Sequence, residues 1–151
     1  MNAIKMVWCG HFVLIAFVAM TLLACGSEDE EPGEIESEDP KVQIDPIRLD
    51  FSDQIAPGSE EQGQITFTNI GGETLEINDL SINPNGPPVY FPGDSFPTST
   101  LLLEPLESHT FSVWYRPNDD QRHRSAINFR TNDPDPQSQS VIPLASDAYN
   151  P

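Results

Sequence analysis

The fold of this chain is decided by the stretch Ile65-Thr66-Phe67-Thr68-Asn69-Ile70-Gly71-Gly72-Glu73-Thr74-Leu75-Glu76-Ile77. On both sides of Gly71-Gly72, apolar residues alternate with polar ones at a period of two, which is typical of strands with one buried face. Glycine adopts positive φ without a steric cost, so the pair predicts a turn between two strands. The stretch therefore predicts β-structure.

The same alternation recurs on both sides of this stretch. Leu80 and Ile82 fall on the opposite parity from Leu75 and Ile77, which predicts a bulge or a change of face. The apolar members of the alternating segments form the predicted core: Ile47, Leu49, Phe51, Ile65, Phe67, Leu75, Ile77, Phe111, Val113, Tyr115, Ile127, Phe129, Ile142 and Leu144.

Residues 83–99 are rich in Pro, Gly and Asn and predict a long loop, with 89–91 as a possible short strand. Residues 101–103 predict a hairpin-like pair with the strand at 111–115, joined by the polar residues 104–108. About seven short strands with turn signals between them, and no helix to cover a sheet, predict an all-β fold: an antiparallel two-sheet immunoglobulin-like sandwich.

The start of the chain predicts export. Lys5 precedes an apolar run at 12–24, which has signal-peptide length and is shorter than the roughly 17 to 25 residues of a spanning helix. Leu22-Leu23-Ala24-Cys25 ends that run and resembles the lipobox of bacterial lipoproteins. The resemblance implies cleavage before Cys25 and a covalent lipid on its sulfur. An uncleaved membrane anchor is the alternative.

Charge and cysteine content limit the partners. Removal of 1–24 would leave 24 acids and 7 − 1 = 6 bases, a net charge of −18, which repels nucleic acid and anionic lipid surfaces. Cys9 would leave with the signal, so no disulfide is expected, and no cofactor is expected beyond the lipid on Cys25. The lipid supplies the membrane attachment. Gly26 lacks the acid that retains enterobacterial lipoproteins at the inner membrane, which favours the outer membrane.

Residues 25–40 predict a disordered acidic linker, because eight acids and one large apolar residue follow Gly26 without a base. Binding of cations or of a basic partner is the alternative for this run. The expected organisation is a signal peptide at 1–24, a lipidated cysteine and linker at 25–40, and one sandwich domain at 41–151.

The domain also resembles a known family. The segments 65–72, 74–77, 111–117, 129–134 and 142–144 together look like the immunoglobulin-like domain of the abnormal spindle and hydin group, called choice-of-anchor D in bacterial surface proteins. The resemblance covers about 44–148 and implies a non-catalytic sandwich for adhesion, scaffolding or surface display. The chain departs from the family in having one copy and in ending Leu144-Ala145-Ser146-Asp147.

Catalytic and metal chemistry have little support in the sequence. His109 and His123 lack zinc-type spacing, and no phosphate loop or nucleophile elbow is present. Residues 118–120 and 132–135 could hold calcium, or could be ordinary Asx and Pro turns. A carbohydrate-active or calcium-dependent surface hydrolase is the alternative function of a different class.

Four residues are candidates for binding a partner. Arg122 and Arg124 belong to the one basic cluster, which could contact phosphate or carboxylate groups or could be a solvated loop. Trp114 and Arg116 should point outward from the same strand face, where a neighbouring segment could also cover them. The expected function is a non-catalytic binding, adhesion or structural module that meets a protein or polysaccharide of the cell envelope. An accessory subunit pairing through an edge strand is a further alternative.

Overall fold

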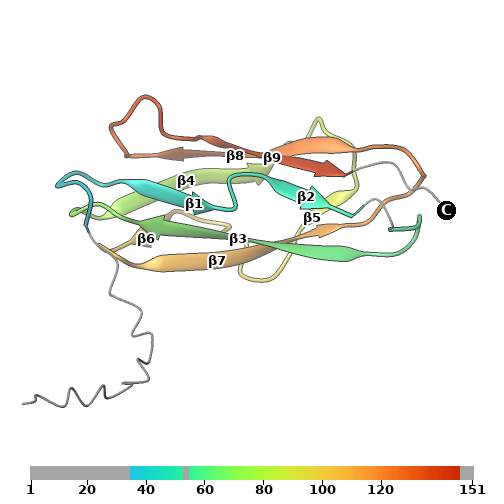
Figure 1. Ribbon diagram of the computed structural model, residues 1–151, viewed down its shortest axis with the longest axis horizontal. Coiled ribbons are helices and arrows are strands. Elements are labelled where there is room, and N and C mark those ends of the chain that lie inside the picture. Colours follow the sequence, from blue (N-terminus) through green and yellow to red (C-terminus); the bar gives the residue numbers. More distant parts are fainter. Residues whose placement is uncertain (1–34, 53–54, 147–151) are drawn as a thin grey trace, which may run out of the picture. The chain divides into compact units, whose positions relative to one another are not determined.

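The computed structural model describes residues 35–52 and 55–146. Within these ranges the chain contains strands and no helix, arranged as two packed sheets (Figure 1). The all-β sandwich predicted from the alternation is confirmed. The predictions for the export segment, Cys25 and most of the linker lie outside the described residues.

The strands are short, and the described residues form nine rather than about seven. They are β1 (Val42–Asp45), β2 (Leu49–Phe51), β3 (Glu61–Asn69), β4 (Leu75–Ile82), β5 (Tyr90–Pro92), β6 (Leu101–Leu103), β7 (Ser108–Tyr115), β8 (Arg124–Thr131) and β9 (Val141–Ser146).

One sheet has the strand order β1-β3-β7-β5 and is antiparallel throughout, whereas the other has the order β2-β9-β8-β4-β6. In the second sheet β2 lies parallel to β9, and the other pairs are antiparallel. The predicted pairing of 101–103 with 111–115 is wrong. β6 pairs with β4 instead, with Leu103 opposite Leu75, because the turn after β6 carries the chain from one sheet to the other rather than folding it back beside itself.

A second crossing separates β1 from β2 and corrects the core. β1 pairs with β3 in one sheet, while β2 pairs with β9 in the other. Ile47 lies in the crossing segment and is 67% exposed, so its prediction as a core residue is wrong. Ile47 has the same parity in the sequence as Leu49 and Phe51, but the chain joins the second sheet only at Leu49. Alternate burial therefore begins at Leu49 and not at Ile47.

The other thirteen predicted core residues are buried between the sheets. Aromatic rings fill the core in two groups. Phe51, Tyr90 and Tyr115 pack with centroids 5.2 to 5.7 Å apart, and Phe67 lies 5.3 Å from Phe111. Four apolar residues that the alternation did not identify complete the core cluster: Ile44, Val89, Tyr90 and Leu103.

The turn between β3 and β4 is built on Asn69, which is fully buried at 0% exposure. Its side-chain amide donates to the carbonyls of Glu73 and Leu103 at 2.8 and 2.9 Å, and its oxygen accepts from the Gly71 amide at 2.9 Å. Gly71 does not adopt positive φ. A side chain at this position would instead clash with the backbone of Asp39. Glycine is therefore needed because the segment that leads into β1 passes close to this turn.

Part of the segment assigned to the linker packs on this turn. The amide of Glu36 donates to the Ile70 carbonyl at 2.8 Å, and Ser37 forms an isolated bridge with Gly71. Lys41 forms an ion pair with Glu36 at 2.9 Å. Residues 35–40 therefore contact the sandwich in the structure.

The predicted parity change in β4 is confirmed as an irregularity. The register against β8 shifts between Asn78 and Ser81, and Asp79 adopts a φ of 56°. β6 pairs with β4 only from Leu75 to Ile77. Beyond that point, within the described residues, the end of β4 has a strand neighbour on one side only.

Candidate functional site

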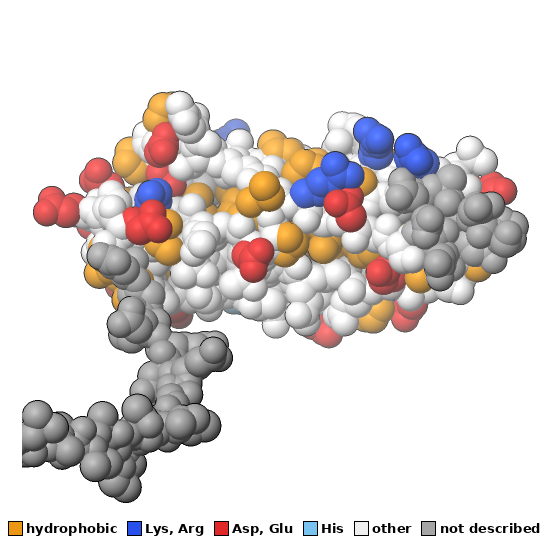
Figure 2. All heavy atoms as spheres, viewed as in Figure 1, with side chains coloured by type: hydrophobic (Ala, Val, Ile, Leu, Met, Phe, Trp, Pro, Cys, Tyr) orange, Lys and Arg blue, Asp and Glu red, His pale blue; other side chains and the backbone are white. Residues whose placement is uncertain are grey.

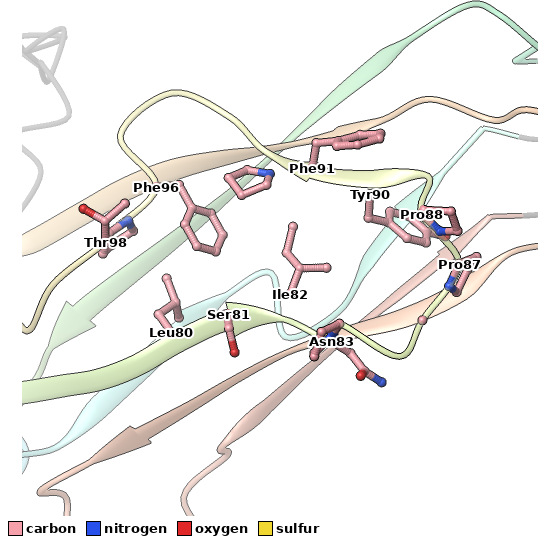
Figure 3. A pocket seen from close by; sticks show the side chains of 14 residues that line it. Leu80, Ser81, Ile82, Asn83, Pro87, Pro88, Tyr90, Phe91, Phe96 and Thr98 are labelled. Atoms are coloured by element: carbon pink, nitrogen blue, oxygen red, sulfur yellow. The ribbon is translucent and has the colours of Figure 1, made fainter.

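An apolar groove of about 470 Å³ lies between the end of β4 and β5, the edge strand of the opposite sheet. We call it the β4–β5 groove. Figure 3 shows Phe96, from the loop that follows β5, facing Leu80 and Ile82 of β4 across this space. It is lined by Leu80, Ser81, Ile82, Asn83, Pro84, Gly86, Pro87, Pro88, Tyr90, Phe91, Pro92, Phe96, Pro97 and Thr98.

No Asp, Glu, Lys, Arg or His occurs among the residues that line the β4–β5 groove, although the chain carries 24 acidic residues. Leu80, Ile82 and Phe96 are half-buried and pack against the core with part of each side chain open. The walls therefore favour apolar groups. The backbone at the end of β4 adds the hydrogen-bonding capacity of a strand edge.

The sequence contained signals for this groove that do not identify a site by themselves. The register shift in β4 absorbs the parity change and keeps Leu80 and Ile82 on the core-facing side, where Ile82 lies opposite the buried Ile127. Residues 83–99 contain the prolines that form the opposite wall. The possible strand at 89–91 is present as β5. The pattern did not show that β6 pairs with β4 only as far as Ile77. Beyond that residue, the segment 97–100 lies near 78–80 without forming a strand there.

Trp114 and Arg116, both binding candidates, lie together on the outer side of β7. Trp114 is half-buried and opposite Phe91 of β5. The Arg116 guanidinium lies 5.4 Å from the Phe91 ring centroid and 5.7 Å from the Trp114 centroid, and pairs with Glu60 at 2.9 Å. β5 thus partly covers the tryptophan, and the arginine stacks on both rings.

Arg122 and Arg124, the other two candidates, are exposed and line a separate hollow of about 320 Å³. We call it the arginine hollow. Its remaining lining residues are Arg48, Asp50, Phe51, Ala145 and Ser146. Figure 2 shows several Lys and Arg side chains at the upper right of the face in view and others farther left, whereas acidic side chains are scattered over that face. The structure thus adds Arg48, which the sequence analysis did not single out.

His123, between these two arginines, is buried, and each of its ring nitrogens lies near a polar side chain. Nδ1 lies 3.0 Å from the Tyr115 hydroxyl, and Nε2 lies 3.2 Å from Asp119 Oδ1. The Ser146 hydroxyl donates to the Tyr115 hydroxyl at 2.8 Å. With Ser146 as its donor, the Tyr115 hydroxyl keeps its own proton available for Nδ1 of His123.

The network holds its hydroxyl groups in the neutral state. Burial raises the pKa of Tyr90 to about 12, and burial also raises the pKa of Tyr115 above its ordinary value. The Tyr90 hydroxyl donates to the His123 carbonyl at 3.0 Å. Ser146 bonds Tyr115 rather than the histidine ring, so the nucleophile–base contact of a serine hydrolase is not made here.

The acidic turns use their carboxylates for local hydrogen bonds. Asp119 Oδ1 accepts from the Gln121 amide at 2.9 Å. Asp133 accepts from the Val42 amide at 3.0 Å and the Ser138 hydroxyl at 2.6 Å. In the described residues, no three His, Cys, Asp or Glu side chains gather as metal ligands would. The Asp119–Gln121 contact and the Asp133–Asp135 contact are those of Asx turns, whereas the Asp133–Val42 contact ties the turn to β1.

None of the described residues belongs to a helix of the length and apolarity that crossing a bilayer requires. Cys25, the predicted lipidation site, lies outside the described residues.

Comparison with known proteins places the fold. No family model matches the chain, and no curated protein resembles its sequence. A crystal structure of a protein of unknown function from Porphyromonas gingivalis W83 is similar, with a TM-score of 0.57, 16% identity, and coverage of 77% of this chain and 48% of that one. This chain thus spans about half of that protein.

Two further structures share the fold. The ASH/PapD-like domain 7 of human CEP192 has a TM-score of 0.51 and 12% identity, with coverage of 94% of this chain and 99% of that one. The secreted serine protease VesC from Vibrio cholerae has a TM-score of 0.52 and 14% identity, with coverage of 74% and 23%. The sandwich is therefore immunoglobulin-like, and similar to PapD-like domains. Similarity at these identities concerns the fold, and function has to be argued from the surfaces.

Proposed function

We propose that this protein is an exported bacterial lipoprotein whose immunoglobulin-like sandwich is a non-catalytic binding module. The lipobox-like Leu22-Leu23-Ala24-Cys25 supports attachment through a lipid on Cys25. Gly26 in the following position favours the outer membrane. The acidic chain offers anionic lipid no electrostatic attraction, so the lipid has to provide the attachment.

The observation that carries the binding function is the β4–β5 groove. Its lining has no charged side chain, in a chain of net charge −17. A charged ligand would lose its hydration there without gaining an ion pair. The groove therefore suits an uncharged apolar segment, and we assign its occupant as an extended segment of a partner protein of the cell envelope.

An extended segment fits because the groove combines side-chain space with a strand edge. β4 continues to Ile82, while β6 covers only Leu75 to Ile77. A segment added beside the end of β4 would hydrogen-bond to the backbone and place every second side chain between the sheets. Leu80, Ile82 and Phe96 would contact those side chains (Figure 3).

The size of the groove sets the expected affinity. Two or three buried aliphatic side chains contribute about 1.5 to 3 kcal/mol each, and the cost of association and ordering offsets much of that. A dissociation constant of about 0.1 to 1 mM is expected for a short peptide. Tighter binding in the envelope would arise from the shared membrane surface, which raises the effective concentration of both partners.

A synthetic peptide of alternating valine and threonine tests the groove. Its binding should shift the methyl NMR signals of Leu80 and Ile82. The same peptide with alternate amides N-methylated keeps its side chains and loses its strand-edge hydrogen bonds, so it should bind much more weakly. Equal binding of both peptides would contradict strand addition.

A matched pair of variants separates the groove from general surface stickiness. Ile82→Thr places a hydroxyl in the groove, whereas Val141→Thr makes the same kind of change at a strand residue that is 43% exposed and does not line it. Only Ile82→Thr should weaken peptide binding, by about tenfold. An equal loss in both variants would show that the peptide binds elsewhere.

Attachment is tested independently of the groove. Cys25→Ser should release the protein from the membrane fraction or block its processing, because the sulfur that carries the lipid is gone. The sandwich should remain folded, since Cys25 precedes it in the chain. Continued membrane fractionation of the Cys25→Ser protein would refute the lipid anchor without bearing on the groove.

A further inference from the structure

The outer face of the four-stranded sheet is formed mainly by its two central strands, β3 and β7. Ile65, Phe67 and Phe111 are buried on the inner face, so the residues that alternate with them point outward. We call this outward surface of the two strands the β3–β7 face. It consists of Gln62, Gln64, Thr66, Thr68, Ser108, Thr110, Ser112 and Trp114. None of these residues is charged.

The lack of charge on this face does not follow from the composition. Charged residues make up 21% of the chain, and such residues normally occupy exposed positions. The outer face of the five-stranded sheet shows that ordinary pattern, because Glu76, Arg124 and Arg130 are all exposed there. The two outer faces of the sandwich therefore differ in chemistry.

Hydroxyl groups on the β3–β7 face are held in pairs across the two strands. Thr66 Oγ1 and Thr110 Oγ1 lie 2.8 Å apart, and Thr68 Oγ1 and Ser108 Oγ also lie 2.8 Å apart. Each hydroxyl has one proton to donate and two lone pairs to accept with, and the bond inside a pair uses only one proton and one lone pair. Together with the exposed amide of Gln64, the pairs therefore offer both donors and acceptors to a ligand.

One end of the face is aromatic. Trp114 lies opposite Gln62 of β3 on one side and opposite Phe91 of β5 on the other. Phe91 is 37% exposed. The Arg116 guanidinium stacks on both rings, 5.4 and 5.7 Å from their centroids, and its Nε pairs with Glu60 at 2.9 Å. The stacking orders the two rings, and the ion pair adds a formal charge of 1 − 1 = 0 to this end.

The chemistry of the face limits what it can hold. β3 is hydrogen-bonded to β1 and β7, and β7 is hydrogen-bonded to β3 and β5, so neither strand has a free edge for a peptide. A charged ligand would lose hydration without gaining an ion pair on these two strands. A stable protein interface needs a buried apolar centre, whereas the centre of this face consists of hydroxyl and amide groups. These properties favour an uncharged ligand that is rich in hydroxyl groups.

We propose that the β3–β7 face binds an uncharged polysaccharide. Sugar hydroxyls both donate and accept, as the groups of Gln64 and Thr110 do. The C–H groups on one side of a sugar ring form an apolar surface that can pack on the aromatic end at Trp114. From Gln62 to Thr68 the face extends over 68 − 62 = 6 residue steps, which is about 20 Å along a strand, so it has the length for several linked sugars.

Three uncharged probes test this assignment: cellohexaose, maltohexaose and chitohexaose. At least one should shift the NMR signals of the Gln64 side-chain amide and the Trp114 indole in the purified protein, and the probe that acts at the lowest concentration identifies the linkage. Hexagalacturonate should need at least about a tenfold higher concentration, because its carboxylates meet an acidic protein and no free cation on the face. Failure of all three probes, equal action of hexagalacturonate, or a Trp114 shift that depends on protein concentration alone and so reports self-association would overturn the proposal.

A matched set of variants locates the site. Gln64→Ala/Thr110→Val removes one amide and one hydroxyl of the face, at two exposed positions, and should weaken binding of the best probe by about tenfold or more. Gln137→Ala removes an equally exposed amide from the connection between β8 and β9, and should leave binding within about twofold. Equal effects of the double variant and of Gln137→Ala would refute the site.

Failure of this site and failure of the groove are distinguishable. Gln64 and Thr110 do not line the β4–β5 groove, so Gln64→Ala/Thr110→Val should bind the valine–threonine peptide as tightly as the unmodified protein does. Ile82→Thr should in turn leave binding of the hexasaccharide unchanged. Loss of both ligands in either variant, with an unaltered circular dichroism spectrum, would contradict two separate sites.

Discussion

Replacement of Asn69 should destabilise the sandwich more than any single exposed polar substitution. Its fully buried side chain makes three hydrogen bonds of 2.8 to 2.9 Å to the backbone of Glu73, Leu103 and Gly71. Each is worth about 1 kcal/mol net, and a buried partner left without a bond costs about 1 to 3 kcal/mol. Asn69→Ala should therefore lower the free energy of unfolding by about 3 to 5 kcal/mol.

Urea unfolding followed by circular dichroism measures this change. The midpoint should fall while the slope stays constant, because the surface exposed on unfolding is nearly the same. Asn132→Ala is the control, since Asn132 also bonds to backbone groups of Glu76 and Thr74 but is exposed. Asn132→Ala should lower the free energy of unfolding by about 1 kcal/mol or less. A decrease for Asn69→Ala that is no larger than the decrease for Asn132→Ala would refute the role given to the buried amide.

An isosteric substitution tests the same reasoning through pH. Asn69→Asp keeps one acceptor but turns an oxygen toward the carbonyls of Glu73 and Leu103, where the amide had donated. Burial beside two carbonyls raises the pKa of the introduced carboxyl. The folded state then binds the proton more tightly than the unfolded state, so this variant should regain stability as the pH falls. Stability that falls with acidification as in the unmodified protein would contradict this account.

The remaining predictions concern Asp133, Gly71 and Tyr90. Partial burial acts to raise the pKa of Asp133, but hydrogen bonds from Ser138, Val42 and Asp135 outweigh it and lower that pKa. The lowered pKa stabilises the folded protein at pH values above the unfolded pKa of about 3.9, and this stabilisation is lost as the pH falls through the folded pKa. In urea unfolding, Asp133→Asn should therefore lower the free energy of unfolding by about 1 kcal/mol at neutral pH and leave it unchanged at acid pH. Gly71→Ala should cost about 2 kcal/mol or more in thermal unfolding, because the new methyl meets the backbone of Asp39; an unchanged melting temperature would be evidence against that packing. Burial raises the pKa of Tyr90 to about 12, so stability should fall between pH of about 10 and 12 as the unfolded tyrosine ionises first, and Tyr90→Phe should remove the highest transition in an ultraviolet absorbance titration.

The sequence predicted the layers of the fold because burial on one sheet face leaves a period-two signal. Phe67, Ile77 and Phe129 lie where the alternation placed them. Ile47 does not, because the same alternation extends into a segment that crosses between sheets. Local periodicity carries no information about where a chain changes sheet.

Pairing partners were harder to predict than strands. β6 was assigned to the strand at 111–115 because the two are close in sequence, but it pairs with β4. The role of Asn69 was not predicted, because its amide contacts Leu103, 34 residues away. Both contacts are long-range, and the sequence pattern records only local burial.

The candidate sites also divide into residues that the sequence indicated and features that depend on long-range strand pairing. Trp114, Arg116, Arg122 and Arg124 were singled out from their residue types and their strand parity, and the structure places them in two clusters. Arg48 and the β4–β5 groove needed the sheet order. The arginine hollow exists because β2 and β8 flank β9, and no spacing in the sequence indicates that arrangement.

Amide hydrogen exchange at the end of β4 tests the central claim most directly, because strand addition has to protect backbone amides there. On addition of the valine–threonine peptide, we expect slower exchange for amides within 79–82, with no change at β1, an edge strand of the other sheet. The Asn83 amide already donates to the Ala126 carbonyl and should not respond. The N-methylated peptide should give no such protection. Peptide binding without protection at 79–82, or with equal protection by the N-methylated peptide, would contradict the assignment of this edge as the binding site.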